Sequence, residues 1–215
     1  MFYRRKLPHW LPEVSAEAFV FITWRLAGSV SWGGRFCLPG GPGAFAWQAD
    51  SGAGVSACQP GSPTFRQSFL SLERETDKAA FGPVWLRHPQ VATMVAQTLH
   101  HGESEMDFYR LRAWVIMPNH VHLVMLPKRP LPVIMRWLKG STARKADLIL
   151  GRTGEIFWQD ESFDHIVRDE AELDWLVHYV ERNPVTAALI SNPAAWPWSS
   201  AGWEVKTPTP VAQEV

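Results

Sequence analysis

The chain has 215 residues, enough for one sizeable domain, and its 21 basic and 21 acidic side chains leave no formal net charge. A balanced charge argues against a protein that coats duplex DNA, because such binding depends on an excess of lysine and arginine. The longest apolar run, around 111–126, is interrupted by Pro118, Asn119 and two histidines, so it falls short of the roughly 20 apolar residues of a membrane span.

The basic N-terminus, MFYRRKLPHW, is not followed by the apolar core or the small-residue cleavage site of a secretory signal. The two cysteines, Cys37 and Cys58, fall in a stretch rich in glycine and proline and indicate no disulfide framework. We therefore expect a cytoplasmic protein with no membrane partner.

A strand is predicted over residues 18–26, AFVFITWRL, where the pattern alternates and β-branched and aromatic types are frequent. The composition then changes to glycine, proline, serine and alanine, which indicates an irregular insertion or loop at about 27–63. Apolar residues at helical spacing predict a helix over 89–101, with Pro89 in its first turn and Gly102 as its stop.

Two adjoining strands are predicted over 108–117 and 120–126, joined at Pro118-Asn119 as a tight antiparallel hairpin. A helix follows over 131–150 and ends at Gly151. Its apolar residues lie on one side, and basic residues occupy the rest.

The last strand is predicted around 163–168 and the last long helix over 170–182. Asp169 followed by Glu172 forms an acidic capping box at the start of this helix. Pro184 is expected to interrupt the helix, because the residue before a proline avoids the helical region.

The order strand–helix–strand–strand–helix–strand–helix describes an α+β sandwich of the ferredoxin-like kind. We expect one antiparallel sheet with helices on one face and a C-terminal helix that bears Tyr179. Residues 1–205 are predicted to form a single domain that includes the insertion at about 27–63. The polar, proline-containing residues 206–215 are predicted to form a flexible tail.

His120 and His122 lie two positions apart in the apolar run AWVIMPNHVHLVML. In a strand both side chains project from the same face, about 6–7 Å apart at the base, so both rings can turn toward one divalent ion. An HxH pattern in a strand is also a common coincidence, and taken alone it does not establish a metal site.

Tyr179 lies at the edge of the buried stripe of the last long helix, where its hydroxyl can be held and still be reached from solvent. Asn183 follows one turn later and can aim its carbonyl oxygen at an ion near Tyr179. Two alternatives stay open. In the first, Tyr179 is an amphipathic edge residue that only packs. In the second, Asn183 caps a following short helix that starts at Pro184.

These residue types suit cleavage of a phosphodiester by a tyrosine. A phenol with a pKa of about 10 is a poor nucleophile at neutral pH, and a divalent cation can neutralise the phosphate oxygens and stabilise the leaving 3′-oxygen. We expect Mg²⁺ or Mn²⁺, of which Mn²⁺ suits histidine ligands better. Because histidines must be neutral to ligate, activity is expected to fall as the pH drops through about 6–6.5.

Four motifs in order, AWVIMPNHVHLVM, FWQDESFDHIVRD, YVERNPVTAALI and WPWSS, with the opening YRRKLPHW, resemble those of REP-associated tyrosine transposases. These are single-tyrosine HUH endonucleases related to the insertion-sequence transposases that mobilise single-stranded DNA. The resemblance covers roughly 1–26 and 65–203. It implies a ferredoxin-like catalytic domain whose partner is single-stranded DNA with imperfect hairpins, often repetitive extragenic palindromes.

The resemblance implies that His120 and His122 bind the metal and that Asn183 takes the place of the third ligand. It also implies that Tyr179 is the nucleophile. Attack of Tyr179 on a DNA phosphodiester then gives a 5′-phosphotyrosyl intermediate and a free 3′-OH. The protein is expected to be a monomer or a homodimer.

Contacts to DNA are expected from two segments with clustered basic residues, the alternative being that each cluster is an ordinary solvated face. They are the N-terminal arm Tyr3, Arg4, Arg5 and Lys6, and the helix residues Arg136, Lys139, Arg144 and Lys145.

Two other functions stay open. One is a domesticated protein that binds hairpin DNA without cutting it, and the other is a metal-dependent phosphoesterase of small substrates in which Tyr179 only packs. The joint presence of His120, His122 and Tyr179 favours the cutting enzyme over the binding protein, because binding alone has no need of all three.

Overall fold

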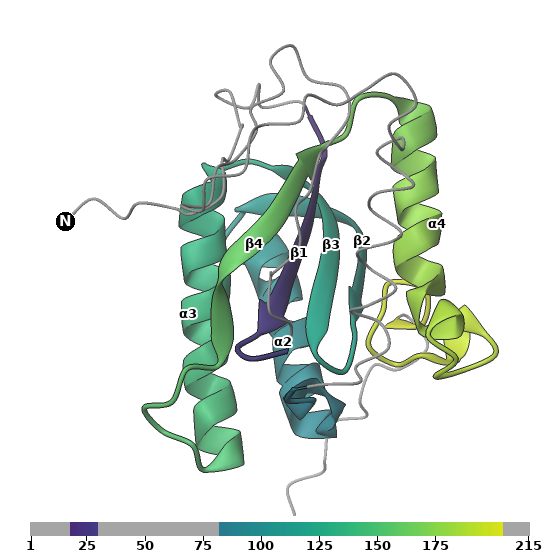
Figure 1. The fold of residues 1–215 in the computed structure, drawn as a ribbon. Helices are drawn as coiled ribbons and strands as arrows, with labels where there is room; N and C mark the ends of the chain where they lie inside the picture. Colours follow the sequence, from purple (N-terminus) through teal and green to yellow (C-terminus); the bar gives the residue numbers. More distant parts are fainter. Residues whose placement is uncertain (1–17, 30–81, 204–215) are drawn as a thin grey trace, which may run out of the picture.

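The computed structural model describes residues 18–29 and 82–203 (Figure 1). In these residues the strands are β1 (Val20–Leu26), β2 (Tyr109–Ile116), β3 (His120–Pro127) and β4 (Trp158–Ile166). The α-helices are α2 (Pro89–Ser104), α3 (Leu131–Leu150) and α4 (Glu170–Thr186), with short 3₁₀ helices η1 (Trp85–Arg87) and η2 (Pro193–Ala195). The order of strands and α-helices is the one predicted from the sequence.

The strands form one antiparallel sheet in the order β2-β3-β1-β4. In the pairing of β1 with β3, Thr23 lies opposite His122 and Arg25 lies opposite His120. The predicted α+β class with a single antiparallel sheet is confirmed. The hairpin of β2 and β3 is confirmed as well, with His120 at the start of its second strand.

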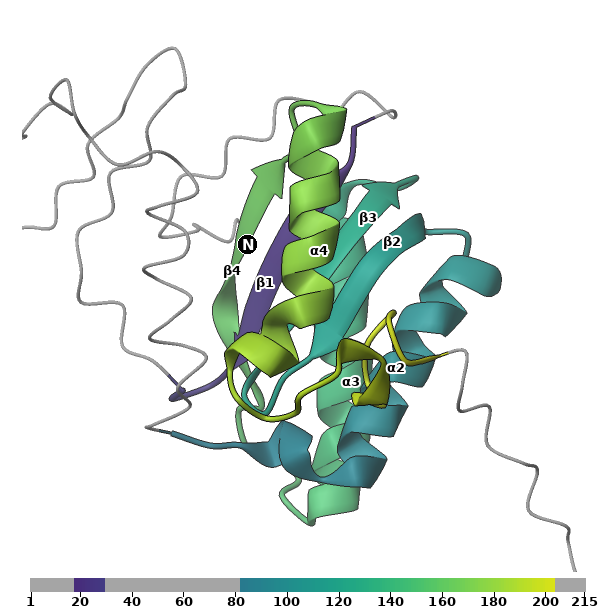
Figure 2. The ribbon, with the colours of Figure 1, turned by 90° about the vertical axis from the view of Figure 1, so that its right-hand side faces the viewer.

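A layer of helix covers each face of the sheet (Figure 2). α2 and α3 lie on one face, where Ile22 and Trp24 of β1 enter the larger core. α4 lies on the other face, where Phe21 packs with Leu176 and Val180. The expectation of helices on one face thus holds for α2 and α3 only. Every residue of β1 is buried, so the strand needs cover on both sides.

α2 continues past its predicted stop, because Gly102 permits a close contact and does not end the helix. The Tyr109 hydroxyl donates a hydrogen bond to the Leu99 carbonyl, 2.9 Å away, across this part of α2. A Cβ atom at Gly102 would fall inside contact distance of the Tyr109 hydroxyl and 2.9 Å from the Trp137 ring. The missing side chain therefore lets β2 and α3 approach the helix.

Two further element bounds differ from the prediction. β4 starts at Trp158, five residues early, because that indole is buried in the core and donates to Thr142 Oγ1 at 2.8 Å. α4 runs through Pro184 to Thr186. The buried Pro184 removes one backbone donor, but its carbonyl accepts from Leu189 at 2.9 Å, so the helix end stays bonded.

Several predictions fall outside the described residues. They are the arm Tyr3–Lys6, most of the insertion at about 27–63 and the tail 206–215. The division into one domain and a tail therefore stays a prediction. Within the described ranges, no helix is long and apolar enough to cross a membrane.

The close contact at Gly102 predicts opposite effects for two Gly→Ala changes in helices. Gly102→Ala should lower the free energy of unfolding by about 1–2 kcal/mol, because overpacking outweighs the gain in helix propensity. Gly140→Ala on α3 meets nothing within 4 Å and should raise it by about 0.5–1 kcal/mol. Urea unfolding of the two variants measures both, and a stabilised Gly102→Ala would contradict the packing argument.

Candidate active site

The two histidines of β3 lie on the sheet face that α4 covers. Val121 and Leu123 point into the core under α2 and α3, so the intervening His120 and His122 point the other way. Both imidazoles are fully buried, and their Nε2 atoms lie 3.0 Å apart. The structure therefore brings the predicted pair together on one face, ring against ring.

Neighbours of the pair fix how each ring is turned. The Nδ1–H of His120 donates to Asn119 Oδ1 at 2.7 Å, and an amide oxygen can only accept. Burial, helped by the neighbouring His122 and the Arg25 guanidinium, holds the pKa of His120 well below its ordinary value. A neutral imidazole with its proton on Nδ1 presents a lone pair at Nε2, which is the form that ligates metal.

His122 can adopt either neutral tautomer because its partner is a hydroxyl. Its Nδ1 lies 2.8 Å from Thr23 Oγ1, and a threonine hydroxyl both donates and accepts. When Thr23 donates, His122 carries its proton on Nε2 and donates to the lone pair of His120. When Thr23 accepts, His122 carries its proton on Nδ1. Neither Nε2 atom then carries a proton, and both can bind one ion.

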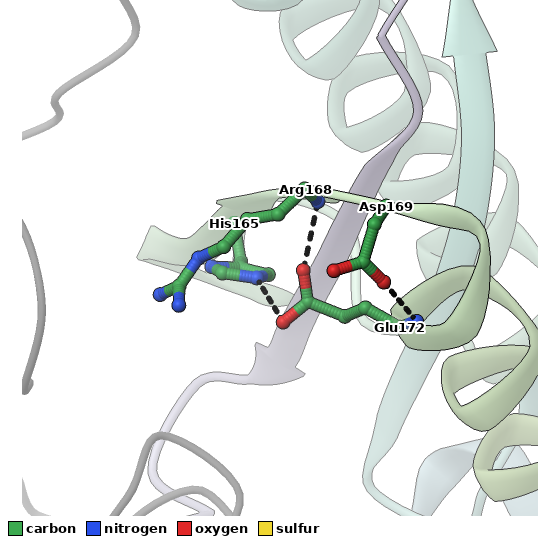
Figure 3. Close-up of polar contacts among 4 residues, drawn as sticks. All are labelled: His165, Arg168, Asp169 and Glu172. Carbon is green, nitrogen blue, oxygen red and sulfur yellow. Dashed lines mark hydrogen bonds and ion pairs between the residues drawn. The ribbon is translucent and has the colours of Figure 1, made fainter.

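α4 is fixed at its start by the predicted capping box (Figure 3). The Asp169 carboxylate accepts from the Glu172 backbone at 2.8 Å, and the Glu172 carboxylate accepts from the Arg168 backbone at 2.8 Å. Glu172 also pairs with His165 Nε2 of β4 at 3.1 Å. Burial lowers the pKa of His165, and the Glu172 carboxylate opposes that shift. The box thus ties α4 to the edge strand.

The other end of α4 is held by the WPWSS segment. Ser200 Oγ donates to the Glu181 carboxylate at 3.0 Å and accepts from the backbone N–H of Trp114 in β2, and the Ser200 backbone N–H donates to the Trp114 carbonyl. Ser199 forms a bridge with Val115, and the Trp196 indole donates to the Ile116 carbonyl at 3.1 Å. The helix is therefore anchored at both ends over the histidine pair.

Tyr179 reaches the histidine pair from α4. Its ring centroid lies 5.5 Å from that of His122, and the Trp175 ring stacks against it at 5.7 Å. The residue is half-buried, as expected at the edge of the buried stripe. Its hydroxyl accepts a hydrogen bond from Asn183 Nδ2 at 3.1 Å.

Asn183 links the nucleophile candidate to the histidines. Its Nδ2 also lies 3.4 Å from His122 Nε2, while its Oδ1 is buried and has no partner among the described residues. A half-turn of the amide exchanges the two atoms and aims the carbonyl oxygen at the histidine pair. Asn183 lies inside α4, so the alternative that it caps a later helix is wrong.

These groups fit a divalent cation. The two Nε2 atoms, 3.0 Å apart on one face, could both bind one divalent cation. The orphaned Asn183 oxygen supplies a third, neutral donor. The described residues hold no cluster of three or more His, Cys, Asp or Glu that could bind a metal, so this mixed set is the site available there.

The predicted DNA-binding residues of the described chain lie on α3, across the sheet from the histidines. Arg136, Arg144 and Lys145 are exposed. The Lys139 ammonium instead donates to the carbonyls of residues 159, 160 and 161 at 3.0, 2.9 and 3.2 Å, which ties α3 to the start of β4. A role for these residues in DNA binding stays a prediction.

Three neighbours of the pair were not identified from the sequence: Thr23, Arg25 and Asn119. The available signal was the alternation in VFITWRL, which places Thr23 and Arg25 on the same side of β1. The sequence does not show that β1 pairs with β3, or in which register, and the structure shows both.

The buried His120 predicts a pH-dependent stability of the metal-free protein. Its pKa is low in the folded state and about 6.5 when unfolded, so below pH 6.5 only the unfolded chain takes up this proton. Stability is present above that pH and is lost as the pH falls, by up to about 1.4 kcal/mol per pH unit.

Chemical unfolding with EDTA at pH 7, 6 and 5 measures this slope. His120→Gln should flatten it, and His88→Gln, which removes an exposed imidazole, should keep the wild-type slope. Equal slopes in the wild type and His120→Gln would contradict the burial argument.

Two comparisons with known proteins found similar ones. Residues 85–183 match the family described as "Transposase IS200 like", a span that runs from η1 to Asn183 and includes the histidine pair and Tyr179. A solved structure described as "Structure of the REP associates tyrosine transposase bound to a REP hairpin" is 16% identical, with a TM-score of 0.47, and covers 95% of this chain and 85% of that one. No curated protein matches the chain. The family match confirms the resemblance predicted from the motifs and establishes the chain's similarity to the IS200-like transposases over residues 85–183.

Proposed function

We propose that this protein is a metal-dependent single-stranded DNA endonuclease and strand transferase that acts on hairpin-containing DNA. One observation carries the proposal. A single amide, that of Asn183, lies within 3.1 Å of the Tyr179 hydroxyl and 3.4 Å of His122 Nε2. A half-buried phenol thus lies beside two buried imidazoles and an amide, an arrangement that packing alone does not require.

Each residue has one task in the proposed reaction. His120, His122 and the Asn183 carbonyl hold a Mg²⁺ or Mn²⁺ ion, which supplies charge for the phosphate and for the leaving oxygen. Trp175, which stacks on the Tyr179 ring, orients that ring. Asn119 and Thr23 keep the imidazoles turned with Nε2 toward the ion.

The chemical step is a transesterification. Tyr179 Oη loses its proton and attacks phosphorus, a P–Oη bond forms, and the P–O3′ bond breaks. The leaving 3′-oxygen takes up a proton, which leaves a 5′-phosphotyrosine and a free 3′-OH. Attack by another strand's 3′-OH reverses the step and releases Tyr179, so strands are rejoined without external energy.

The low pKa of His120 revises the pH dependence expected from the sequence. That imidazole stays neutral well below pH 6.5, so its contribution to metal binding persists below the range of about 6–6.5 first expected.

The nucleophile is tested by Tyr179→Phe on a hairpin oligonucleotide with Mn²⁺. The wild type should form a covalent adduct that survives a denaturing gel, and the variant should form none while still binding the hairpin. Tyr109→Phe, which removes a buried hydroxyl bonded to the Leu99 carbonyl, is the matched control and should keep the adduct.

The outcome separates the three candidate functions. An adduct in Tyr179→Phe would remove Tyr179 from the mechanism. Tight hairpin binding with no cleavage by the wild type would favour the binding protein, and turnover of a small phosphoester without an adduct would favour the phosphoesterase.

The role of Asn183 as an oxygen donor predicts contrasting metal affinities in two variants. Asn183→Ala should weaken Mn²⁺ binding about 10-fold or more, whereas Asn183→Asp should bind at least as tightly as the wild type, because a carboxylate is a stronger ligand. Titration calorimetry without DNA measures both affinities. An unchanged affinity in Asn183→Ala would exclude it as a ligand.

A further inference from the structure

Arg25 lies next to the candidate metal site without a task in the proposed reaction. It is the residue of β1 directly opposite His120 of β3, so both side chains share the face under α4. The residue is only 3% exposed.

The charge of Arg25 is unusual in this place. A guanidinium cannot be deprotonated in a protein, and burying it is costly unless anions pair with it. The proposed metal ligands are two neutral imidazoles and an amide, so they neutralise none of the charge of a divalent cation. A metal ion and Arg25 together would therefore place about three positive charges on one face, and this face favours an anionic ligand.

A small pocket between β1 and β4 shows what else lies near Arg25. It is lined by Thr23, Trp24, Arg25, Gln159, Glu161, Ser162 and Phe163. Glu161 is the acidic residue among them, so its carboxylate is an anion close to Arg25 on the β4 side. Arginine presents five donors in a fork, so one guanidinium can contact more than one anion.

We propose that Arg25 is a catalytic residue that contacts a non-bridging oxygen of the scissile phosphate. This rests on the proposed function, since it assigns one more group to the same reaction. The negative charge on that phosphate grows as Tyr179 attacks, so a fixed guanidinium stabilises the transition state more than the bound substrate. No new bond forms to Arg25 and no proton leaves it.

The competing explanation is structural: Arg25 only pairs with Glu161 and ties β1 to β4. The two explanations differ in whether Arg25 interacts with one particular oxygen of the DNA. A structural arginine changes stability and acts equally on every substrate, whereas a phosphate contact acts through one particular non-bridging oxygen.

The test compares wild type, Arg25→Gln and Arg25→Lys on a hairpin oligonucleotide cleaved in Mn²⁺. The scissile group is either a phosphodiester or one of the two methylphosphonate stereoisomers, each lacking a different charged oxygen. With phosphodiester DNA, Arg25→Gln should form adduct about 100-fold more slowly than wild type, the usual loss for one transition-state donor. Arg152→Gln is the control, since Arg152 lies over the Trp85 ring away from the site, and it should react at the wild-type rate.

The stereoisomers give the decisive result. The rate penalty is the ratio of the rates with phosphodiester and with methylphosphonate DNA. For one stereoisomer this penalty should be at least about 10-fold smaller in Arg25→Gln than in wild type, because the missing oxygen is the one that the guanidinium contacts. The penalty for the other isomer should stay as in wild type. Equal penalties in wild type and variant for both isomers, or an Arg25→Gln rate within about threefold of wild type, would overturn the proposal.

A measurement without turnover tests the charge itself. Removing a nearby positive charge should tighten Mn²⁺ binding to the DNA-free protein, so Arg25→Gln should bind Mn²⁺ several-fold more tightly than wild type, and Arg25→Lys should not. Unchanged affinity would overturn the placement of Arg25 beside the ion. If thermal melting shows that Arg25→Gln does not fold, Arg25→Lys, which keeps the charge and loses the fork, carries the stereoisomer comparison. A wild type that forms no adduct refutes the proposed function instead, and the Mn²⁺ comparison still decides the position of Arg25.

Discussion

The register between β1 and β3 is the constraint on which the candidate site depends. It places Thr23 opposite His122 and Arg25 opposite His120, two pairs whose members lie 99 and 95 residues apart along the chain. The same register sends Ile22 and Trp24 into the core under α2 and α3. A slip by one residue would exchange the two faces, bury Arg25 in that core and turn Trp24 toward the histidines. The packing of the larger core therefore holds the polar site in place, since any movement of β1 that disturbs one disturbs both.

The second requirement is a helix that presents a phenol to this face at a fixed height. α4 gains its position from apolar contacts of Leu176 and Val180 with Phe21, and its ends are fixed by polar contacts of different kinds. Glu172 joins the start to β4, and Glu181 joins the last turns to the C-terminal segment beside β2. A helix held only by its apolar face can rotate or slide at small cost, whereas two polar attachments more than two turns apart oppose both movements. The position of Tyr179 thus depends on residues that never approach the histidines.

Sequence patterns predicted what depends on local periodicity. The bounds of α3, the capping box of Asp169 and Glu172, and the shared face of His120 and His122 all follow from spacing within a few residues. What failed depends on tertiary packing. The local preference of the residue before Pro184 predicts that α4 ends there, but α4 runs on to Thr186 with Pro184 buried inside it. The spacing of Gly102 predicts a helix stop, but glycine is needed there because the Tyr109 side chain of β2 packs against it. The partners Thr23 and Asn119, and the side of the sheet that α4 covers, required the pairing of distant strands.

The chemistry of the site also follows from a balance that these elements impose. Neutral ligands bind a divalent cation more weakly than carboxylates do, and a buried arginine beside them weakens it further. The charge that such a site lacks is the charge a nucleic acid brings, so under the proposed function a metal ion and DNA should each bind better in the presence of the other. A carboxylate in place of Asn183 would relieve the excess charge but would also compete with the phosphate for the ion. In the proposed reaction an amide at this position would keep the attraction for the phosphate, and the register of β1 would hold Arg25 where it could contact a non-bridging oxygen of that phosphate.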